Sequence, residues 1–473
     1  MGSPLPWQRA TIERHNIHKR CKLFYMKYKI YLLNSLFCLV FQCLSAQAIK
    51  VSVLKGEKGW ELLREGKPYY IKGAGGQTFL DEVVATGGNS IRTWGLDDAQ
   101  TILDEAHKRG LTVMLGLWVQ HERHGFDYNN KANVQKQLDA FKKAVLTYKD
   151  HPALLLWGVG NEVDLNYSNI KVWDAIQDIA KMIHEIDPNH PTSTVTAGLD
   201  SLEVQLIKAK APDIDIYGIN TYGDVGNVKK NLRNFGWAGP YMITEWGPNG
   251  HWEVQKTKWG ASIEQTSHEK AESYRNRYTQ FIQGDSAYCV GSYVFLWGFK
   301  QEYTATWYGM FSKEGKATET VDAVEYAWKG KKPENPAPEL LKVVLNGQAA
   351  NTDLSLKSQE MNEARVEIAY QGKEKLTYYW EILKESDDKK EGGDAEKEAE
   401  AVTGLIKGNG KESISFRAPL VQGAYRLFVT ISTKDKIAYA NIPFYVTART
   451  ANDPQARFIQ PKIYDFKSFS VTE

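Results

Sequence analysis

Two glutamates, each at the end of a short hydrophobic run, are the residues of this chain best suited to do chemistry. Glu162 directly follows Asn161 after the run 154–160, and Glu245 follows the run that begins at Tyr241. If both runs are buried strands that end at the same edge, the two carboxylates point into one cleft. Paired carboxylates that flank a sugar are the usual means of hydrolysing a glycosidic bond. The elements around them must show whether they can meet.

Hydrophobic runs alternate with stretches of helical period between residues 49 and 332, as expected of repeated βα units. Eight runs are predicted strands: 69–75, 89–94, 112–118, 154–162, 192–197, 214–222, 241–246 and 290–297. Eight such units favour a (β/α)8 TIM barrel in the α/β class. The alternative is an open doubly wound sheet, but no G-x-G-x-x-G motif follows an early strand.

Amphipathic helices are predicted in most gaps between these runs. The segment 134–148 places Leu138, Phe141, Val145 and Leu146 on one apolar stripe. Further helices are predicted near 99–110, 172–186, 271–282 and 321–328. Helices of this kind are the outer layer that a TIM barrel requires.

Charged and aromatic side chains gather where the predicted strands end. Active sites of TIM barrels lie at the carboxyl ends of the strands, where the loops converge. The residues concerned are Arg92, Trp94, Trp118, Asn161, Glu162, Tyr222, Glu245, Trp246 and Trp297. The sequence therefore predicts one pocket at this end of the barrel.

The pattern changes at a linker rich in proline and charge, 331–338. Beyond it, short alternating strands predict an immunoglobulin-like β-sandwich over residues 333–450. Within that domain, 384–400 is almost entirely charged and small residues, which predicts a solvated, mobile hairpin loop. The tail 451–473 has no period and no predicted structure.

Residues 1–48 have the features of an export signal. Two lysines precede the apolar stretch 30–44, and Ala46-Gln47-Ala48 matches a cleavage signature. The stretch is shorter than the ~20 apolar residues of a membrane span, and Met26 is a plausible start, which makes 1–25 an upstream extension. We expect a protein exported to the periplasm or medium; a surface lipoprotein anchored at Cys43 is disfavoured because Gln42 precedes it.

Removal of residues 1–48 would take away seven basic residues and one acidic residue, which changes the formal net charge from +2 to −4. A mildly acidic chain without a basic block has no electrostatic support for nucleic-acid binding. Cys289 would be the remaining cysteine, so no intrachain disulfide could form. We expect a monomer without a membrane span, whose partner is its substrate.

The motifs 88–94, 160–162 and 244–247 together resemble the clan of retaining glycosidases built on eightfold barrels. The barrel followed by one immunoglobulin-like domain is also similar to glycoside hydrolase family 158. That family comprises endo-β-1,3-glucanases of gut Bacteroides-type bacteria. The resemblance implies an endo-acting hydrolase of β-1,3-glucan, such as laminarin.

The clan resemblance assigns roles residue by residue. Glu162 would be the acid/base and Glu245 the nucleophile. Asn161 would bond the sugar 2-hydroxyl, and Arg92 and Tyr222 would hold the nucleophile ionised and oriented.

The clan places an aromatic platform for the reacting sugar at the end of strand eight, which would be Trp297. Trp94, Trp118 and Trp246 are further candidate platforms.

The segment Gln120-His121-Glu122-Arg123-His124 contains two histidines but not the H-E-x-x-H spacing of a zinc site. We expect a substrate-contacting loop instead, with His121 as the subsite residue. No cofactor is implied, because side chains supply the acid, the base and the nucleophile.

Two other functions are compatible with the same sequence. The carboxylates do not fix the sugar, so a β-mannanase, a cellulase or an exo-β-glycosidase on the same barrel stays possible. A non-catalytic glycan-binding protein is disfavoured because Glu162, Glu245, Asn161 and Arg92 are all present.

Overall fold

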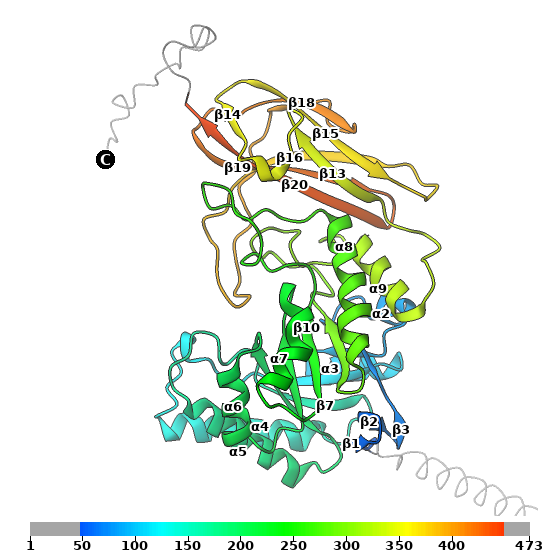
Figure 1. The fold of residues 1–473 in the computed structure, drawn as a ribbon, viewed down its shortest axis with the longest axis vertical. Coiled ribbons are helices and arrows are strands. Elements are labelled where there is room, and N and C mark those ends of the chain that lie inside the picture. Colours follow the sequence, from blue (N-terminus) through cyan, green and yellow to red (C-terminus); the bar gives the residue numbers. More distant parts are fainter. Residues whose placement is uncertain (1–47, 449–473) are drawn as a thin grey trace, which may run out of the picture.

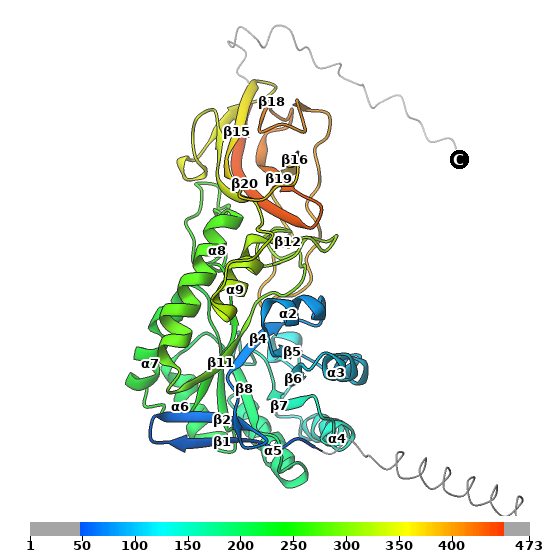
Figure 2. The same ribbon diagram turned by 90° about the vertical axis from the view of Figure 1, so that its right-hand side faces the viewer.

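The structure is a computed structural model that describes residues 48–448. The predicted export signal and the tail 451–473 lie outside the described residues, apart from Ala48. Within 48–448, no helix is both long and apolar enough to cross a membrane. Figures 1 and 2 show the small sheet β1–β3 at one end of the molecule and a two-sheet domain at the other.

Eight parallel strands close into a barrel in the order β10-β11-β4-β5-β6-β7-β8-β9. They match the eight predicted runs, although most strands are shorter than predicted. Their bounds are β4 Ile71–Gly75, β5 Ser90–Arg92, β6 Thr112–Leu117, β7 Leu154–Val159, β8 Thr192–Ala197, β9 Ile216–Asn220, β10 Tyr241–Trp246 and β11 Cys289–Val294.

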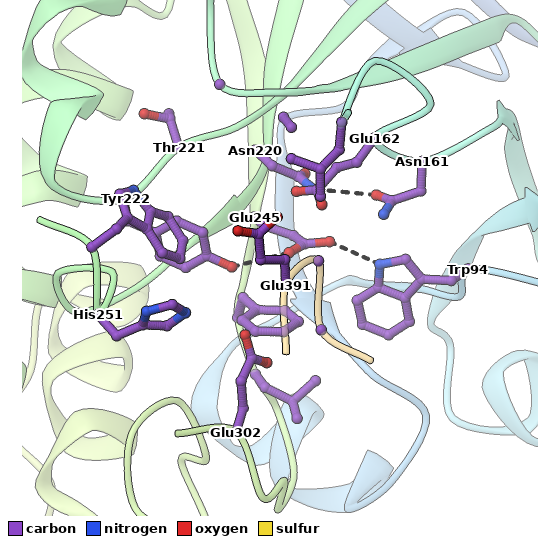
Figure 3. A pocket seen from close by; sticks show the side chains of 18 of the residues that line it. Trp94, Asn161, Glu162, Asn220, Thr221, Tyr222, Glu245, His251, Glu302 and Glu391 are labelled. Carbon is purple, nitrogen blue, oxygen red and sulfur yellow. Dashed lines mark hydrogen bonds between the residues drawn. The ribbon is translucent and has the colours of Figure 1, made fainter. Parts of the chain in front are cut away.

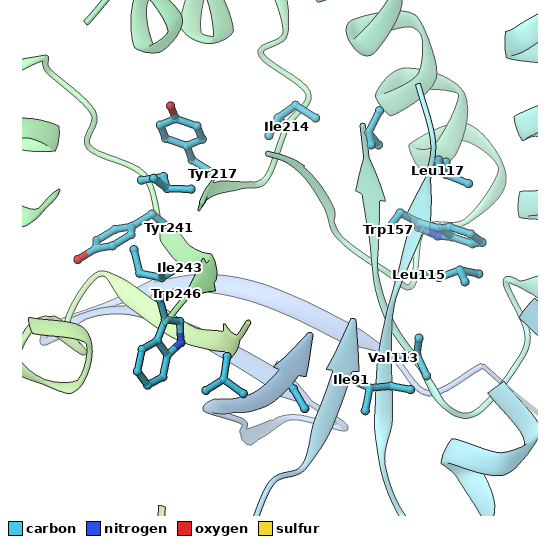
Figure 4. Close-up of a cluster of buried hydrophobic side chains, with 14 of the residues drawn as sticks. Ile91, Val113, Leu115, Leu117, Trp157, Ile214, Tyr217, Tyr241, Ile243 and Trp246 are labelled. Atoms are coloured by element: carbon cyan, nitrogen blue, oxygen red, sulfur yellow. The ribbon is translucent and has the colours of Figure 1, made fainter. Parts of the chain in front are cut away.

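Side chains alternate between the inside and the outside of the barrel because successive residues of a strand face opposite sides. On β6, Val113 and Leu115 belong to the outer core under the helices (Figure 4), whereas Met114 belongs to the inner core. The inner core also contains Val51 and Leu62 from the small antiparallel sheet of β1 (Val51–Gly56), β2 (Gly59–Arg64) and β3 (Lys67–Pro68).

Eight α-helices form between and after the strands of the described chain. They are α2 Leu80–Thr86, α3 Ala99–Lys108, α4 Lys131–Tyr148, α5 Lys171–Ile186, α6 Ser201–Lys210, α7 Val228–Asn234, α8 Ser267–Asn276 and α9 Glu319–Lys329. The predicted stripe on α4 is wrong at Leu146, which is 53% exposed because it lies about 100° around the helix from buried Val145.

Helix α8 begins earlier than the sequence period predicted. Thr266 and Glu269 form a reciprocal capping box that satisfies backbone N–H groups at the start of the helix, so α8 begins at Ser267. Its predicted second half, Arg277–Ile282, is a π-helical turn.

The C-terminal domain packs two sheets around a core of its own. One sheet joins β13 (Glu339–Leu345), β15 (Met361–Ala369), β18 (Ser413–Arg417) and β17 (Ile406–Lys407). The other joins β16 (Thr377–Lys384), β19 (Gly423–Ser432), β20 (Lys436–Thr447), β14 (Ser355–Lys357) and β12 (Ala317–Thr318). The predicted fold class, a TIM barrel followed by an immunoglobulin-like β-sandwich, is confirmed.

Backbone pairing and a buried polar cluster attach the β-sandwich to the barrel domain. Strand β12, which precedes α9, pairs with β20. At the contact between the two domains, the Glu264 carboxylate accepts hydrogen bonds from Lys270 (2.5 Å), Thr304 (2.7 Å) and Asn441 (2.5 Å). Arg426 of β19 donates to the backbone oxygen of Ser262 at 2.6 Å. Such contacts hold the two domains in one arrangement.

Candidate active site

A cleft of about 760 Å³ lies at the carboxyl ends of the barrel strands. That volume suits a ligand of a few sugar units. Both Glu162 and Glu245 line it, and Figure 3 shows them within one group of side chains. The carboxylates that the sequence placed on separate strands therefore meet in one cleft.

Glu162 follows β7 on a turn that departs from ordinary backbone geometry. Gly160 has φ 79° and Glu162 itself has φ 50°, a left-handed conformation that costs a residue with a Cβ of order 1–3 kcal/mol. The Glu162 backbone N–H donates to the Val195 oxygen at 2.9 Å, and Asn220 donates to its carboxylate at 2.8 Å. Strain held in this way is common where a side chain must be aimed for function.

The environment of Glu162 favours its protonated form. Burial raises the pKa of this carboxyl, and the negative charge of Glu245 raises the pKa further, while the hydrogen bond from Asn220 opposes both effects. The carboxyl is thus poised to carry a proton near neutral pH, as a general acid must.

Glu245 has the opposite environment, because several donors surround its carboxylate. Arg92 and Trp94 donate to Oε1 at 3.0 and 2.8 Å, and Tyr222 donates to Oε2 at 3.0 Å. Burial, and then the charge of Glu245, raise the pKa of the Tyr222 phenol well above its ordinary value, so it stays a donor. These contacts fix both oxygens and place a cation beside the negative charge.

A chain of polar contacts in the lining of the cleft connects the two carboxylates. Asn161 Oδ1 accepts from Arg92 at 2.6 Å and from Asn220 at 3.1 Å. Asn220 Oδ1 in turn accepts from Thr244 at 2.8 Å. Since the Asn161 oxygen is occupied twice, its Nδ2 is the group left to donate to a ligand.

Asn220 was not selected from the sequence as a site residue. It ends β9, two residues before Tyr222, so the rule that strand ends line the site could have found it. Its contacts with Glu162 and Asn161, 58 and 59 residues away, have no local sequence signal.

The predicted platform Trp297 is wrong. It is 1% exposed and belongs to the outer core, where it stacks on Trp328 and donates to the Phe79 oxygen. Strand β11 ends at Val294, earlier than predicted, and Phe295 and Leu296 line the cleft instead.

Trp246 is also wrongly predicted as a substrate contact. It is fully buried against Tyr274 and Tyr278 outside the barrel (Figure 4). The register of β10 shifts between Ile243 and Glu245, and the strand then sends Glu245 into the cleft and Trp246 to the outer face.

The aromatic surfaces of the cleft come from other residues. Trp94 and Trp118 line the cleft, as do Tyr222, Phe295 and Trp252. Phe295 packs edge-on against both Trp94 and Tyr222, with ring centroids 5.9 and 6.0 Å apart. Flat apolar faces of this kind suit the faces of sugar rings.

The predicted subsite residue His121 does not line the cleft. It is 1% exposed and stacks behind Trp118, with ring centroids 4.7 Å apart. Burial, and then the charge of Arg123, lower the pKa of His121 to about 4, so the ring is neutral. The residue supports Trp118 and does not reach a ligand in the cleft. Within residues 48–448, no group of three His, Cys, Asp or Glu side chains is arranged to hold a metal ion.

Residues 89–275 match a family described as glycosyl hydrolases family 2, TIM barrel domain. A curated relative, mannan endo-1,4-beta-mannosidase F of Aspergillus fumigatus, is 24% identical over 187 residues, which are 33% of this chain and 42% of that protein. The barrel segment of this chain is therefore similar to the barrels of glycoside hydrolases.

Two solved structures resemble the chain more loosely. A putative beta-galactosidase from Bacteroides fragilis has 14% identity and a TM-score of 0.46, over 85% of this chain and 58% of that one. A beta-glucuronidase from Bacteroides uniformis has 14% identity and a TM-score of 0.45, over 84% and 48%. This chain thus spans roughly half the length of each of these proteins.

Proposed function

We propose that the protein is a retaining, endo-acting hydrolase of β-1,3-glucan, with Glu162 as acid/base and Glu245 as nucleophile. One observation carries the catalytic part: two carboxyl groups share a cleft, one buried so that it keeps its proton and the other surrounded by donors. One environment favours a carboxyl group that keeps its proton, and the other favours an ionised carboxylate. This difference distinguishes a general acid from a nucleophile.

The proposed reaction has two steps. A Glu245 oxygen attacks the anomeric carbon while Glu162 gives its proton to the departing glycosidic oxygen, which forms a glycosyl ester. The ester removes the charge of Glu245, one of the causes that raise the pKa of Glu162, so the Glu162 carboxyl stays deprotonated after it has given up its proton and is available as the base. It then takes a proton from the water that cleaves the ester. Proton NMR should show first a sugar of the same anomeric configuration as the bond cleaved.

The charges in the cleft support a neutral glycan rather than a uronide as the substrate. Six carboxyl groups and one lysine line the cleft among the described residues: Glu162, Asp224, Glu245, Glu253, Glu302, Glu391 and Lys300. The lysine is itself paired with Glu302 at 2.7 Å. A substrate carboxylate would meet mostly negative charge, which disfavours its binding.

The aromatic residues support binding of several sugar units. Trp252, which follows β10, is 55% exposed in the cleft lining. Trp118, which follows β6, also lines the cleft and is half-buried. Aromatic rings away from the two carboxyl groups would stack on sugar units beyond those joined by the cleaved bond. This arrangement favours internal cleavage of a chain over removal of single terminal sugars.

Incubation of the purified protein with laminarin, other β-glucans and β-mannan would test the substrate assignment. We expect a ladder of oligosaccharides from laminarin. Release of monosaccharide alone would replace the endo-acting proposal with an exo-acting one. Cleavage of β-mannan alone would support the second candidate, a β-mannanase, which the mannanase relative favours.

The pH dependence of hydrolysis should have an alkaline limb set by Glu162. Because the proposed acid must be protonated, kcat/KM should fall as pH rises through the raised pKa of Glu162, by about tenfold per pH unit above it. The measurement is kcat/KM for an oligosaccharide between pH 5 and 10. The residual activity of Glu162→Gln should lack this alkaline limb. If kcat/KM of Glu162→Gln still fell at the same pH, a group other than Glu162 would be responsible for the limb.

A further inference from the structure

The segment 385–398 of the β-sandwich, which we name the sandwich loop, extends from the sandwich to the mouth of the barrel. It follows β16 and extends toward the barrel, and Figure 1 shows it as the orange-brown loop. Three of its residues, Glu391, Gly392 and Gly393, line the cleft that contains Glu162 and Glu245. The prediction of a solvated hairpin is therefore correct only in part, because the segment is partly exposed but also lines the cleft.

One side of the sandwich loop is bound to the barrel loops after β6 and β7. Arg123 donates to Asp394 at 2.9 Å, and His124 lies 3.2 Å from the same carboxylate. Asn166 donates to Glu391 Oε2 at 2.7 Å. A Cβ on Gly392 would lie 2.7 Å from both the Arg123 guanidinium and Leu165, so the backbone approaches the barrel closely.

The other side of the sandwich loop contacts the segment after β11. Glu396 accepts a hydrogen bond from the Tyr303 backbone N–H at 2.6 Å. Lys389 lies over the Tyr303 ring, 4.2 Å from its centroid. A Cβ on Gly393 would lie 2.5 Å from Lys300 Nζ. The loop therefore reaches both the β6–β7 side and the β11 side of the barrel mouth.

The base of the sandwich loop is held by a buried ion pair. Glu385 accepts from Arg426 Nε at 2.6 Å and from Nη2 at 3.0 Å, and both side chains are less than one-tenth exposed. A bidentate arginine–carboxylate pair of this kind has a defined orientation. The loop is thus fixed at its base as well as at its tip.

The barrel itself contributes little to the cleft at the strands that the sandwich loop spans. In the closed order, β4 and β5 lie between β11 and β6. The connection from β4 to α2 is the short segment 76–79 and lines none of the cleft; that from β5 to α3 contributes Trp94 alone. The sandwich loop supplies the wall that these connections lack.

We propose that the sandwich loop closes one side of the substrate cleft and that Glu391 is a specificity-determining residue on it. The proposal rests on the proposed glycosidase function. The Glu391 side chain is exposed in the cleft lining (Figure 3), and a carboxylate that accepts one bond from Asn166 keeps further acceptor sites for a sugar hydroxyl. The loop thereby limits how many sugar units bind on that side.

Three variants test the role of the sandwich loop. In the first, a short Gly-Ser linker replaces residues 386–397. Glu391→Ala removes the hydrogen bond from Asn166, and Asp394→Ala removes the contacts with Arg123 and His124. Both variants serve if the excised protein does not fold. Glu400→Gln is the matched control, because Glu400 pairs with Lys384 in a solvent-exposed contact outside the cleft.

Two measurements are made on each variant. The first is the bond-cleavage pattern and KM for an end-labelled β-1,3-gluco-oligosaccharide. The second is its Kd, measured in the Glu245→Gln background where no turnover competes. We expect the excision to shift the cleavage positions and raise KM and Kd about tenfold, as loss of a charge-assisted hydrogen bond does. Glu400→Gln should match the unmodified protein.

The outcomes separate this proposal from the proposed function. Unchanged cleavage pattern, KM and Kd in an active excision variant would overturn the role of the loop and leave the glycosidase assignment intact. If the unmodified protein binds a glycan but cleaves none, and the variants bind that glycan more weakly, the role of the loop would be supported and the hydrolytic function overturned. Failure of the unmodified protein to bind any glycan of the panel would overturn both.

Discussion

Replacement of Glu245 by glutamine should lower kcat/KM for glycan hydrolysis by about 10⁴-fold or more, because no nucleophile remains to form the glycosyl ester. That factor corresponds to about 5–6 kcal/mol of transition-state stabilisation. Glutamine has the shape of glutamate, and its amide oxygen can still accept from Arg92 and Trp94. The fold should therefore survive, which circular dichroism and the melting temperature would check.

The Glu162→Ala variant should separate the two proposed roles. An activated aryl glycoside has a leaving group that needs no proton, so the first step should stay fast and release a burst of phenolate. The second step needs a base and should be slow. Azide, a nucleophile that needs no deprotonation, should restore turnover of Glu162→Ala but should not speed hydrolysis of natural glycan. Absence of both burst and azide rescue would contradict the acid/base role.

Replacement of Lys270 by methionine should destabilise the protein by about 3–5 kcal/mol, because it leaves the buried Glu264 carboxylate without its cation. The Lys270 and Glu264 side chains are 7% and 1% exposed, and Lys270 also donates to the Thr306 oxygen at 2.6 Å. Since the same carboxylate accepts from Asn441 of the sandwich, the variant should also weaken the contact between the domains. Calorimetry should show a melting temperature lowered by roughly 10 °C.

The double variant Lys270→Met, Glu264→Gln should recover part of that loss, because it removes the uncompensated charge. The matched control is Lys329→Met, which breaks a more exposed ion pair with Glu325 on α9. The control should change stability by less than about 1 kcal/mol. Equal losses for Lys329→Met and Lys270→Met would mean that burial of the Lys270 pair does not govern its contribution.

The sequence by itself determined the barrel and the position of the two glutamates along it. The eight runs are buried on both faces and alternate with amphipathic helices, a local pattern that few architectures satisfy. Strands of such a barrel end at one mouth, so Glu162 and Glu245 had to lie at the same end. Sequence alone could also place Asn161, Arg92, Tyr222 and Trp118 near them for the same reason.

Only the tertiary structure decided which side chains face the cleft. A register shift in β10 turns Trp246 outward, and the early end of β11 places Phe295 where Trp297 was predicted. A shift of one residue reverses the face of a strand, and a hydrophobic run does not reveal it because both faces are buried.

The tertiary structure also decided what approaches the cleft from a distance. Asn220 contacts Glu162 across 58 residues, and Glu391 reaches Asn166 across 225. A charged, glycine-containing segment has the composition of a solvated loop, since its local sequence does not encode which surface lies opposite. The short connections after β4 and β5 leave room for the sandwich loop, and the packing of the two domains places it there.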